Sequence, residues 1–139
     1  MTKTLFYVDN DSDELTTFLY AAKTLDIEVR LFKNGEQILD ELRNATDKPF
    51  AVFVDLNMPG IDGFEVIRTV AADKQLSAVA VIAFSTAADQ RTVSAARQVG
   101  ATCYISKPNT IAKLKKVLQF AIGNDWESFD KDSDFLVKY

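Results

Sequence analysis

Several residue types are scarce or missing in this sequence of 139 residues, and each absence narrows its function. Histidine is absent, which excludes histidine-based catalytic triads, histidine metal sites and a role as a phosphohistidine donor. The single cysteine, Cys103, excludes an internal disulfide and argues against a thiolate metal cluster. Because Cys103 lies in the apolar stretch ATCYIS, we expect it to be a buried core residue.

Long apolar runs and excess positive charge are also lacking. No apolar run approaches the roughly 20 residues that cross a bilayer. The opening stretch MTKTLFYVDND becomes acidic before a secretory signal could develop. The net charge of −4 disfavours electrostatic binding to nucleic acid. We therefore expect a cytoplasmic protein with no membrane segment and no direct nucleic-acid partner.

What is present is a regular alternation of strand-like and helix-like patterns. Strand-like apolar segments cover 4–9, 27–32, 51–55, 78–84 and 101–106. Helical patterns cover 11–25 and 87–99, and others begin at Asn34, near Asp62 and at Thr110. Five strands alternating with five helices predict an α/β domain with a parallel sheet and helices on both faces. The segment 27–32 alternates as an edge strand does, and the three most apolar strands are expected at the centre.

The C-terminal segment has a different composition from the rest of the chain. We predict one domain over 1–123 and an acidic, aromatic tail over 124–139. The tail carries large apolar side chains such as Trp126, Phe129 and Phe135, which a purely disordered tail would normally lack. We expect at least part of it to pack on the domain or on a partner.

Polar residues follow four of the five predicted strands. In chain order they are Asp9, Asn10 and Asp11, then Asp55, then Ser85 and Thr86, then Lys107 and Pro108. Each has a plain structural explanation, because acids and serine can cap helices and a lone lysine is usually solvated. In a doubly wound sheet, however, ligands bind beyond the carboxyl ends of the strands, where these residues would meet.

Together these side chains suit the transfer of a phosphoryl group. Oxygen ligands in partial number suit Mg²⁺, with water completing the coordination shell. Mg²⁺ and an ammonium group would neutralise the phosphoryl oxygens, and a hydroxyl could hydrogen-bond them. An aspartate can act as the nucleophile and form an acyl phosphate.

Four segments resemble a response-regulator receiver domain, the phosphoacceptor module of two-component signalling. They are YVDND (7–11), VDLNMPGIDGFEV (54–66), AFST (83–86) and GATCYISKP (100–108). The resemblance covers about residues 3–122 and is to the chemotaxis-regulator-like, stand-alone type. It implies a flavodoxin-like, doubly wound sheet of five parallel strands in the order 2-1-3-4-5, with five helices on two faces.

The resemblance also implies a role for individual residues. Asp55 is the phosphoacceptor, and Ser85 and Lys107 bind the phosphoryl group. The Mg²⁺ ligands are Asp9, Asn10, Asp55 and the backbone carbonyl of Asn57. Ser85 and Tyr104 form the switch, in which Tyr104 follows into space that Ser85 vacates, although plain core packing also explains Tyr104. Pro108 is expected to follow a cis peptide bond. The family usually has Asp where Asn10 stands, so we expect weaker Mg²⁺ binding.

The implied function is that of a response regulator in two-component signal transduction. Asp55 would accept a phosphoryl group from a histidine kinase or a histidine phosphotransfer protein. The face made by the fourth helix, fifth strand and fifth helix would then change shape and pass the signal to an unidentified downstream protein. The chain would be a monomer or weak dimer, and it would catalyse only its own phosphoryl transfer and dephosphorylation.

Other interpretations remain open at this point. One is a receiver-shaped interaction module with a weakened or unused phosphorylation site, which Asn10 favours. A phosphatase of the aspartyl-phosphate type would need an acid where Asn57 stands. A flavodoxin-like cofactor site would need a phosphate-binding loop, whereas DNDSDE is acidic. The lysine cluster at 113, 115 and 116 is either a solvated face or a docking site for an acidic partner.

Overall fold

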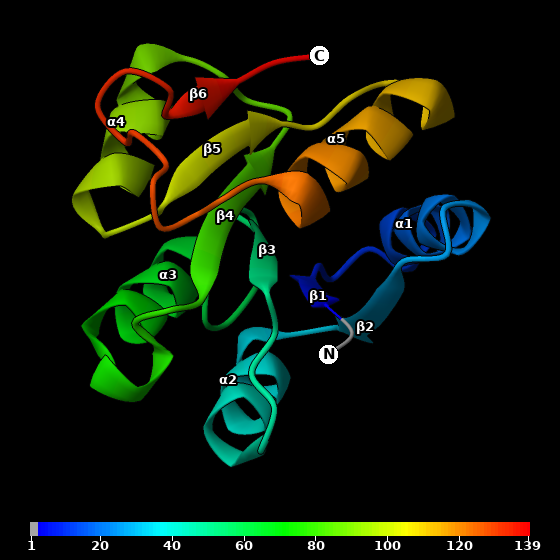
Figure 1. The fold of residues 1–139 in the computed structure, drawn as a ribbon. Helices are drawn as coiled ribbons and strands as arrows, with labels where there is room; N and C mark the ends of the chain where they lie inside the picture. The colour runs from blue at the N-terminus through cyan, green and yellow to red at the C-terminus, as the bar shows by residue number, and fades with distance from the viewer. Residues whose placement is uncertain (1–2) are drawn as a thin grey trace.

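The chain folds into a parallel sheet between two layers of helices, in a computed structural model that describes residues 3–139 (Figure 1). The spatial order of the strands is β2-β1-β3-β4-β5-β6, and every neighbouring pair is parallel. The strands are β1 Thr4–Val8, β2 Glu28–Phe32, β3 Ala51–Asp55, β4 Ala80–Ser85, β5 Cys103–Ser106 and β6 Leu136–Val137. The α/β class and the position of β2 at an edge are confirmed.

Five α-helices begin where the sequence offers a capping side chain. They are α1 Ser12–Thr24, α2 Gly35–Asn44, α3 Gly63–Ala72, α4 Gln90–Gln98 and α5 Ile111–Gly123. Asp11, Asn34, Asp62, Asp89 and Thr110 are the caps, and each accepts a bond from a backbone N–H of the first turn. Helix α4 begins three residues later than predicted because Asp89, rather than Ser85, caps it. A single 3₁₀ turn, Lys74–Leu76, follows α3.

The two faces of the sheet are covered by different helices. Side chains alternate along each strand, so Leu5, Tyr7 and Phe53 face α1 and α5, whereas Phe6 and Val8 face the α2, α3 and α4 side (Figure 1). Strands β3 and β4 are buried along their whole length, as expected for strands covered on both faces. Among the helices that the structure describes, none has the length and apolar character needed to span a bilayer.

The sheet has a sixth strand, which corrects the prediction of five. Strand β6 pairs in parallel with β5, and the Tyr104 N–H donates to the Phe135 carbonyl at 2.8 Å. Phe135 is only 1% exposed and packs in the core that includes Ala96 and Tyr104. Because β5 would otherwise present a row of unpaired backbone groups, the tail supplies hydrogen bonds and buries an aromatic ring at that edge.

The remainder of the tail also contacts the body of the protein. Trp126 Nε1 donates to the Ala121 carbonyl at 3.0 Å, at the end of α5. Its ring packs 5.8 Å from the Phe120 ring and 5.0 Å from the Phe129 ring, measured between centroids. The acidic tail therefore folds back over α5 and β5, by way of the aromatic side chains that distinguish its sequence.

Candidate functional site

The polar residues that follow the strands meet at one end of the sheet. Among the described residues, the structure reports three buried polar or charged side chains: Asp9, Asp55 and Ser85. All three lie at the carboxyl ends of strands, and Asp55 and Ser85 are the last residues of β3 and β4. Burying a carboxylate is costly unless hydrogen bonds or an opposite charge compensate it. This concentration of buried polar groups marks the candidate site.

Lys107 joins the two buried carboxylates. Its Nζ lies 2.9 Å from Asp9 Oδ2 and 3.4 Å from Asp55 Oδ1, and its side chain is only 10% exposed. The register explains the meeting, because residues 5, 7, 51, 53, 103 and 105 all face α1 and α5. Continuing each alternation by one step leads to Asp9, Asp55 and Lys107 on the same side.

Burial and the neighbouring charges shift the pKa values of Asp55 and Lys107. Burial raises the pKa of the Asp55 carboxyl; Lys107 counteracts this, Asp9 adds to it, and the net direction is upward. Burial alone would lower the pKa of Lys107, but its bond to Asp9 and the charge of Asp55 reverse this and raise it. Lys107 is therefore a fixed cation beside two acids, and the cluster keeps a surplus of one negative charge that a bound cation could neutralise.

Tyr7 is a member of this site that the sequence analysis did not identify. Its hydroxyl donates to Asp9 Oδ2, the oxygen that Lys107 also contacts, while the Asp11 N–H donates to Asp9 Oδ1 at 3.0 Å. Burial raises the pKa of Tyr7 and the bond to Asp9 raises it further, so the hydroxyl stays protonated. The sequence does indicate that Tyr7 and Asp9 lie on the same face of the sheet, because side chains two positions apart on a strand point the same way.

The oxygen atoms at this site fit Mg²⁺, although only two of the residues that would hold the ion are carboxylates. Asp9 and Asp55 supply carboxylate oxygens at the rim, where Asn10 and Asn57 are exposed. Within the described part of the chain, no group of three or more acidic, cysteine or histidine side chains is placed to hold a metal. Oxygen ligands from protein in partial number, with water completing the shell, are what Mg²⁺ accepts.

Ser85 and Tyr104 are linked through one loop residue. Ser85 Oγ accepts from the Ala87 N–H at 3.2 Å, and the Tyr104 hydroxyl donates to the Ala87 carbonyl at 2.6 Å. The Tyr104 side chain is fully buried, and its movement into space vacated by Ser85 stays a prediction for the phosphorylated protein. Burial raises the pKa of Tyr104. Over residues 3–139, the structure contains no hydrogen bond between Ser85 Oγ and Asp55.

Other expectations at this rim had mixed outcomes. Asp11 caps α1 by accepting from the Asp13 N–H at 2.9 Å, whereas Asp9 points into the site. The Lys107–Pro108 peptide bond was expected to be cis, but no peptide bond in residues 3–139 is cis. Trans is the intrinsic preference of such bonds. The Lys107 N–H extends the strand pairing by donating to the Ser85 carbonyl at 2.8 Å, and the ammonium still reaches both acids.

The loop after Asp55 is held by two glycines. Gly60 has φ +75°, a left-handed conformation that a glycine adopts without strain after Pro59. Gly63, the first residue of α3, lies so close to the loop that an added Cβ would be 2.2 Å from the Asp55 carbonyl oxygen. Met58, which precedes both glycines in this loop, is buried. The close approach of α3 thus fixes the backbone that carries Asp55.

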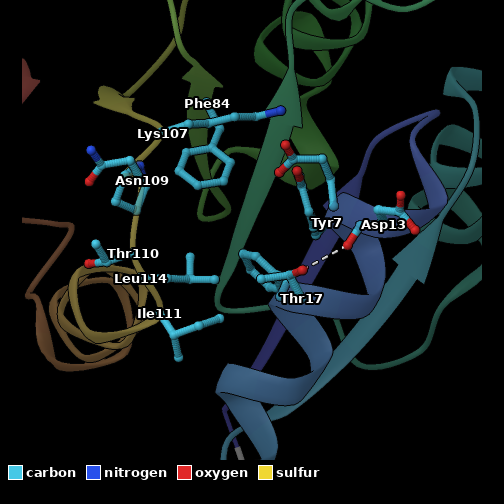
Figure 2. A pocket seen from close by; sticks show the side chains of 12 residues that line it. Tyr7, Asp13, Thr17, Phe84, Lys107, Asn109, Thr110, Ile111 and Leu114 are labelled. Atoms are coloured by element: carbon cyan, nitrogen blue, oxygen red, sulfur yellow. Dashed lines mark hydrogen bonds between the residues drawn. The ribbon is translucent and has the colours of Figure 1, made fainter.

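A groove of about 350 Å³ adjoins the site between the start of α1 and the start of α5. Figure 2 shows Lys107 and Phe84 on one side of it, with Tyr7, Asp13 and Thr17 on the other. Ile111 and Leu114 of α5 line the lower part of the same view (Figure 2). The groove therefore leads from the surface to the Lys107 side of the acidic cluster.

Cys103 lies away from this chemistry. Its side chain is fully buried, as predicted, in the core on the α1 and α5 side. Burial raises the pKa of its thiol to about 12, which keeps the sulfur protonated and unreactive at neutral pH.

Comparison with known proteins gives consistent matches. A family model described as the response regulator receiver domain matches residues 5–119. The chain is 38% identical over 98 residues to the KDP operon transcriptional regulatory protein KdpE of Escherichia coli. It is 33% identical over 108 residues to the transcriptional regulatory protein PrrA of Mycobacterium leprae. These alignments cover 70% and 77% of this chain but only 41% and 44% of the relatives, so the chain spans less than half of their length.

The solved structures include close matches to the fold. The crystal structure of the chemotaxis protein CheY4 of Vibrio cholerae matches with a TM-score of 0.77. The match covers 87% of this chain and 99% of that chain, at 22% sequence identity. The residues that the family model matches, 5–119, include strands β1 to β5 and end before β6.

Proposed function

The chain belongs to the family of response regulator receiver domains of two-component signalling, and we propose that Asp55 is its phosphoacceptor. The observation that carries this proposal is the contact of Lys107 with both buried carboxylates, Asp9 and Asp55. A structural ion pair would need only one acid, whereas phosphoryl transfer uses a nucleophile, a metal ligand and a cation together.

The proposed step is an in-line transfer from a phosphohistidine on a kinase or phosphotransfer protein. A carboxylate oxygen of Asp55 forms a bond to phosphorus as the P–N bond breaks, and the electron pair of that bond leaves with the imidazole. Lys107 exchanges its contact with Asp55 for one with a phosphoryl oxygen while it stays near Asp9. Ser85 Oγ turns from the Ala87 N–H and donates to another phosphoryl oxygen.

Receiver domains generally bind Mg²⁺ at an acidic pocket. We assign the ligands here to Asp9, Asp55, the Asn57 carbonyl and the Asn10 side chain. The metal would supply positive charge that offsets the phosphoryl oxygens. Because Asn10 contributes an uncharged oxygen, we expect a lower affinity than a site with three carboxylates has.

Ala87 is the proposed link from chemistry to signal. The Ala87 N–H donates to Ser85, and the Ala87 carbonyl accepts from Tyr104. When Ser85 binds the phosphoryl group instead, Ala87 is released and the bond to the Tyr104 hydroxyl changes with it. The surface of α4, β5 and α5 would change with it, as a shift between two populated states. We propose a cytoplasmic protein, monomeric or weakly dimeric, that passes this change to a downstream protein.

The assignment of Asp55 is tested by phosphorylation with acetyl phosphate and Mg²⁺, followed by mass spectrometry of the intact chain. The unaltered protein should gain one phosphoryl group, and Asp55→Asn should gain none. Asp47→Asn is the matched control, because Asp47 is exposed and lies outside the site. Phosphoryl incorporation that persists in Asp55→Asn would refute the assignment.

A second candidate is an interaction module whose phosphorylation site is unused. The lack of a third acid at the site, among the described residues, favours it. Titration with beryllofluoride and Mg²⁺, followed by NMR of the Asp55, Ser85 and Ala87 amides, separates the two functions. Large shifts at these amides support phosphoacceptance, and none at saturating ligand supports the module.

A further inference from the structure

Tyr7 places a hydroxyl inside the acidic site, and we propose that it is a positioning residue that leaves one oxygen of the Asp9 carboxylate open to Mg²⁺ and weakens the binding of that cation. The proposal rests on the proposed function, because only there is Asp9 a metal ligand. The Tyr7 hydroxyl donates to Asp9 Oδ2 and has no exposure to solvent.

The hydroxyl is held in place by the packing of its ring. The centroid of Tyr7 lies 4.3 Å from that of Phe18, 5.7 Å from that of Phe84 and 6.5 Å from that of Phe53. These contacts are with the ring, so Tyr7→Phe retains them and removes only the hydroxyl. A rigid aromatic cluster therefore aims a donor at Asp9.

The Tyr7 hydroxyl occupies one of the few acceptor positions of the Asp9 carboxylate. Asp9 Oδ2 accepts from both Tyr7 and Lys107, and Oδ1 accepts from the Asp11 N–H. Each carboxylate oxygen can accept about two bonds. Oδ2 is therefore saturated, and Oδ1 retains the single open position through which Asp9 can bind a cation. Tyr7 thus selects the oxygen that faces the metal and satisfies the buried carboxylate in the metal-free protein.

Removal of the hydroxyl should favour the metal-bound form. Without the Tyr7 hydroxyl, the buried Asp9 carboxylate of the metal-free protein lacks one hydrogen-bond donor. In the metal-bound protein the charge of Mg²⁺ at Oδ1 offsets the same loss. The substitution therefore costs the metal-free form more, and by linkage Mg²⁺ binds more tightly. A hydrogen bond to a charged group is strong enough to change the affinity about tenfold.

The test measures Mg²⁺ affinity by NMR titration of amide shifts, without any phosphoryl donor. Tyr7→Phe should bind Mg²⁺ about tenfold more tightly than the unaltered protein. Tyr20→Phe is the matched control, because Tyr20 is 59% exposed on α1, and its affinity should not change. Affinity that is unchanged or weaker in Tyr7→Phe overturns the proposal.

Two further measurements keep the proposal separate from the proposed function. In the unaltered protein the Tyr7 hydroxyl proton should give a slowly exchanging downfield resonance that moves when Mg²⁺ saturates the site; a resonance that stays fixed overturns the role of Tyr7 even if Tyr7→Phe fails to fold. Asp55→Asn should lose Mg²⁺ affinity whatever Tyr7 does. If it does not, the metal assignment fails, while the comparison of Tyr7→Phe with Tyr20→Phe still decides whether the Tyr7 hydroxyl weakens cation binding.

Discussion

At the scale of single residues, the site combines two acids with one cation in a buried place. Lys107 is shared by Asp9 and Asp55, so the cluster has a surplus of one negative charge. A buried surplus charge destabilises a fold and persists where function requires it. The stability of the protein should therefore rise when the surplus is removed.

Asp55→Asn should raise the free energy of unfolding at pH 7 by about 1–2 kcal/mol. Burial raises the pKa of Asp55, with Lys107 opposing and Asp9 adding, so its folded pKa is above its unfolded value. For such an acid, stability is greatest below the unfolded pKa, about 3.9, and falls as pH rises through the folded pKa. The advantage of Asp55→Asn should therefore grow as the pH rises from about 4 until the folded carboxyl has ionised.

Urea denaturation across that pH range measures this difference. Asp47→Asn should track the unaltered protein, because Asp47 is exposed. If Asp55→Asn proved less stable at pH 7, the contact with Lys107 would outweigh burial and the repulsion from Asp9.

Much of the site was predictable from the sequence, because topology alone gathers residues at strand ends. The meeting of Asp9, Asp55 and Lys107 follows from parallel strands and their alternation. The role of Tyr7 was not predicted, because the apolar pattern of a strand indicates that an aromatic ring is buried but does not indicate which group its hydroxyl contacts. Nor did the sequence reveal that Ala87 joins Ser85 to Tyr104, because both bonds involve backbone atoms.

At the scale of elements, the N-terminus of α3 is built against the loop that carries Asp55. Gly63→Ala would place a Cβ 2.2 Å from the Asp55 carbonyl oxygen and 2.6 Å from the Leu56 Cα, both backbone atoms of that loop. Since backbone atoms must move to relieve this contact, we expect a loss of about 1–3 kcal/mol in stability and slower phosphorylation of Asp55.

Gly123→Ala is the matched control for Gly63→Ala. An added Cβ at Gly123 meets no heavy atom within 4 Å, and this residue ends α5 far from the site. We expect it to be neutral or stabilising by about 0.5 kcal/mol. Thermal unfolding and phosphorylation rates would measure both variants, and equal behaviour of the two would contradict the close approach of α3.

Strand β6 makes the tail a component of the sheet. Phe135→Ala should destabilise the protein by about 3 kcal/mol, because it empties a fully buried position between α4 and β5. Leu136→Ala, at a residue 39% exposed, should cost less than about 1 kcal/mol.

Hydrogen exchange distinguishes loss of the strand from loss of packing elsewhere. The Tyr104 amide donates to the Phe135 carbonyl, so Phe135→Ala should speed its exchange more than that of β1 amides. Uniform acceleration across the sheet would show that the tail is not a separable unit.

The prediction of elements succeeded where patterns are long and failed where they are short. The helical pattern of 111–123 extends over thirteen residues, and the strand 51–55 is apolar at every position before its final aspartate. Strand β6 has two residues, Leu136 and Val137, in an acidic stretch, and it exists because β5 offers a free edge. Such a strand depends on a partner about thirty positions away in the chain, which a local pattern does not encode.

At the scale of the whole molecule, the candidate site and the turn that carries Trp126, here called the tail turn, lie at opposite ends of the strands. Trp126 lines a hollow with Lys3, Phe50 and Ala78, which directly precede β1, β3 and, by two positions, β4. Asp55 and Ser85 are at the other ends of these strands. The one tryptophan of the sequence therefore sits away from the site.

Trp126 fluorescence should report unfolding but not occupancy of the site. We expect saturating beryllofluoride and Mg²⁺ to leave its emission within a few per cent of the starting value, while the Ala87 amide shifts by NMR. Urea should change the emission strongly, because Trp126 loses its contact with Ala121 and Phe120. A large change of emission on beryllofluoride addition, with no unfolding, would show that the tail turn responds to the site.

The alternation of side chains along the strands separates two kinds of work. Asp9, Asp55 and Lys107 belong to the face covered by α1 and α5, whereas Tyr104 belongs to the face covered by α2, α3 and α4. Ser85 directly follows Phe84, a residue of the first face, so the alternation places Ser85 with Tyr104 on the second face. If Asp55 is the phosphoacceptor, we expect substitutions at Asp9 and Lys107 to change the chemistry alone, whereas those at Ser85 should change the chemistry and the response of Tyr104 together.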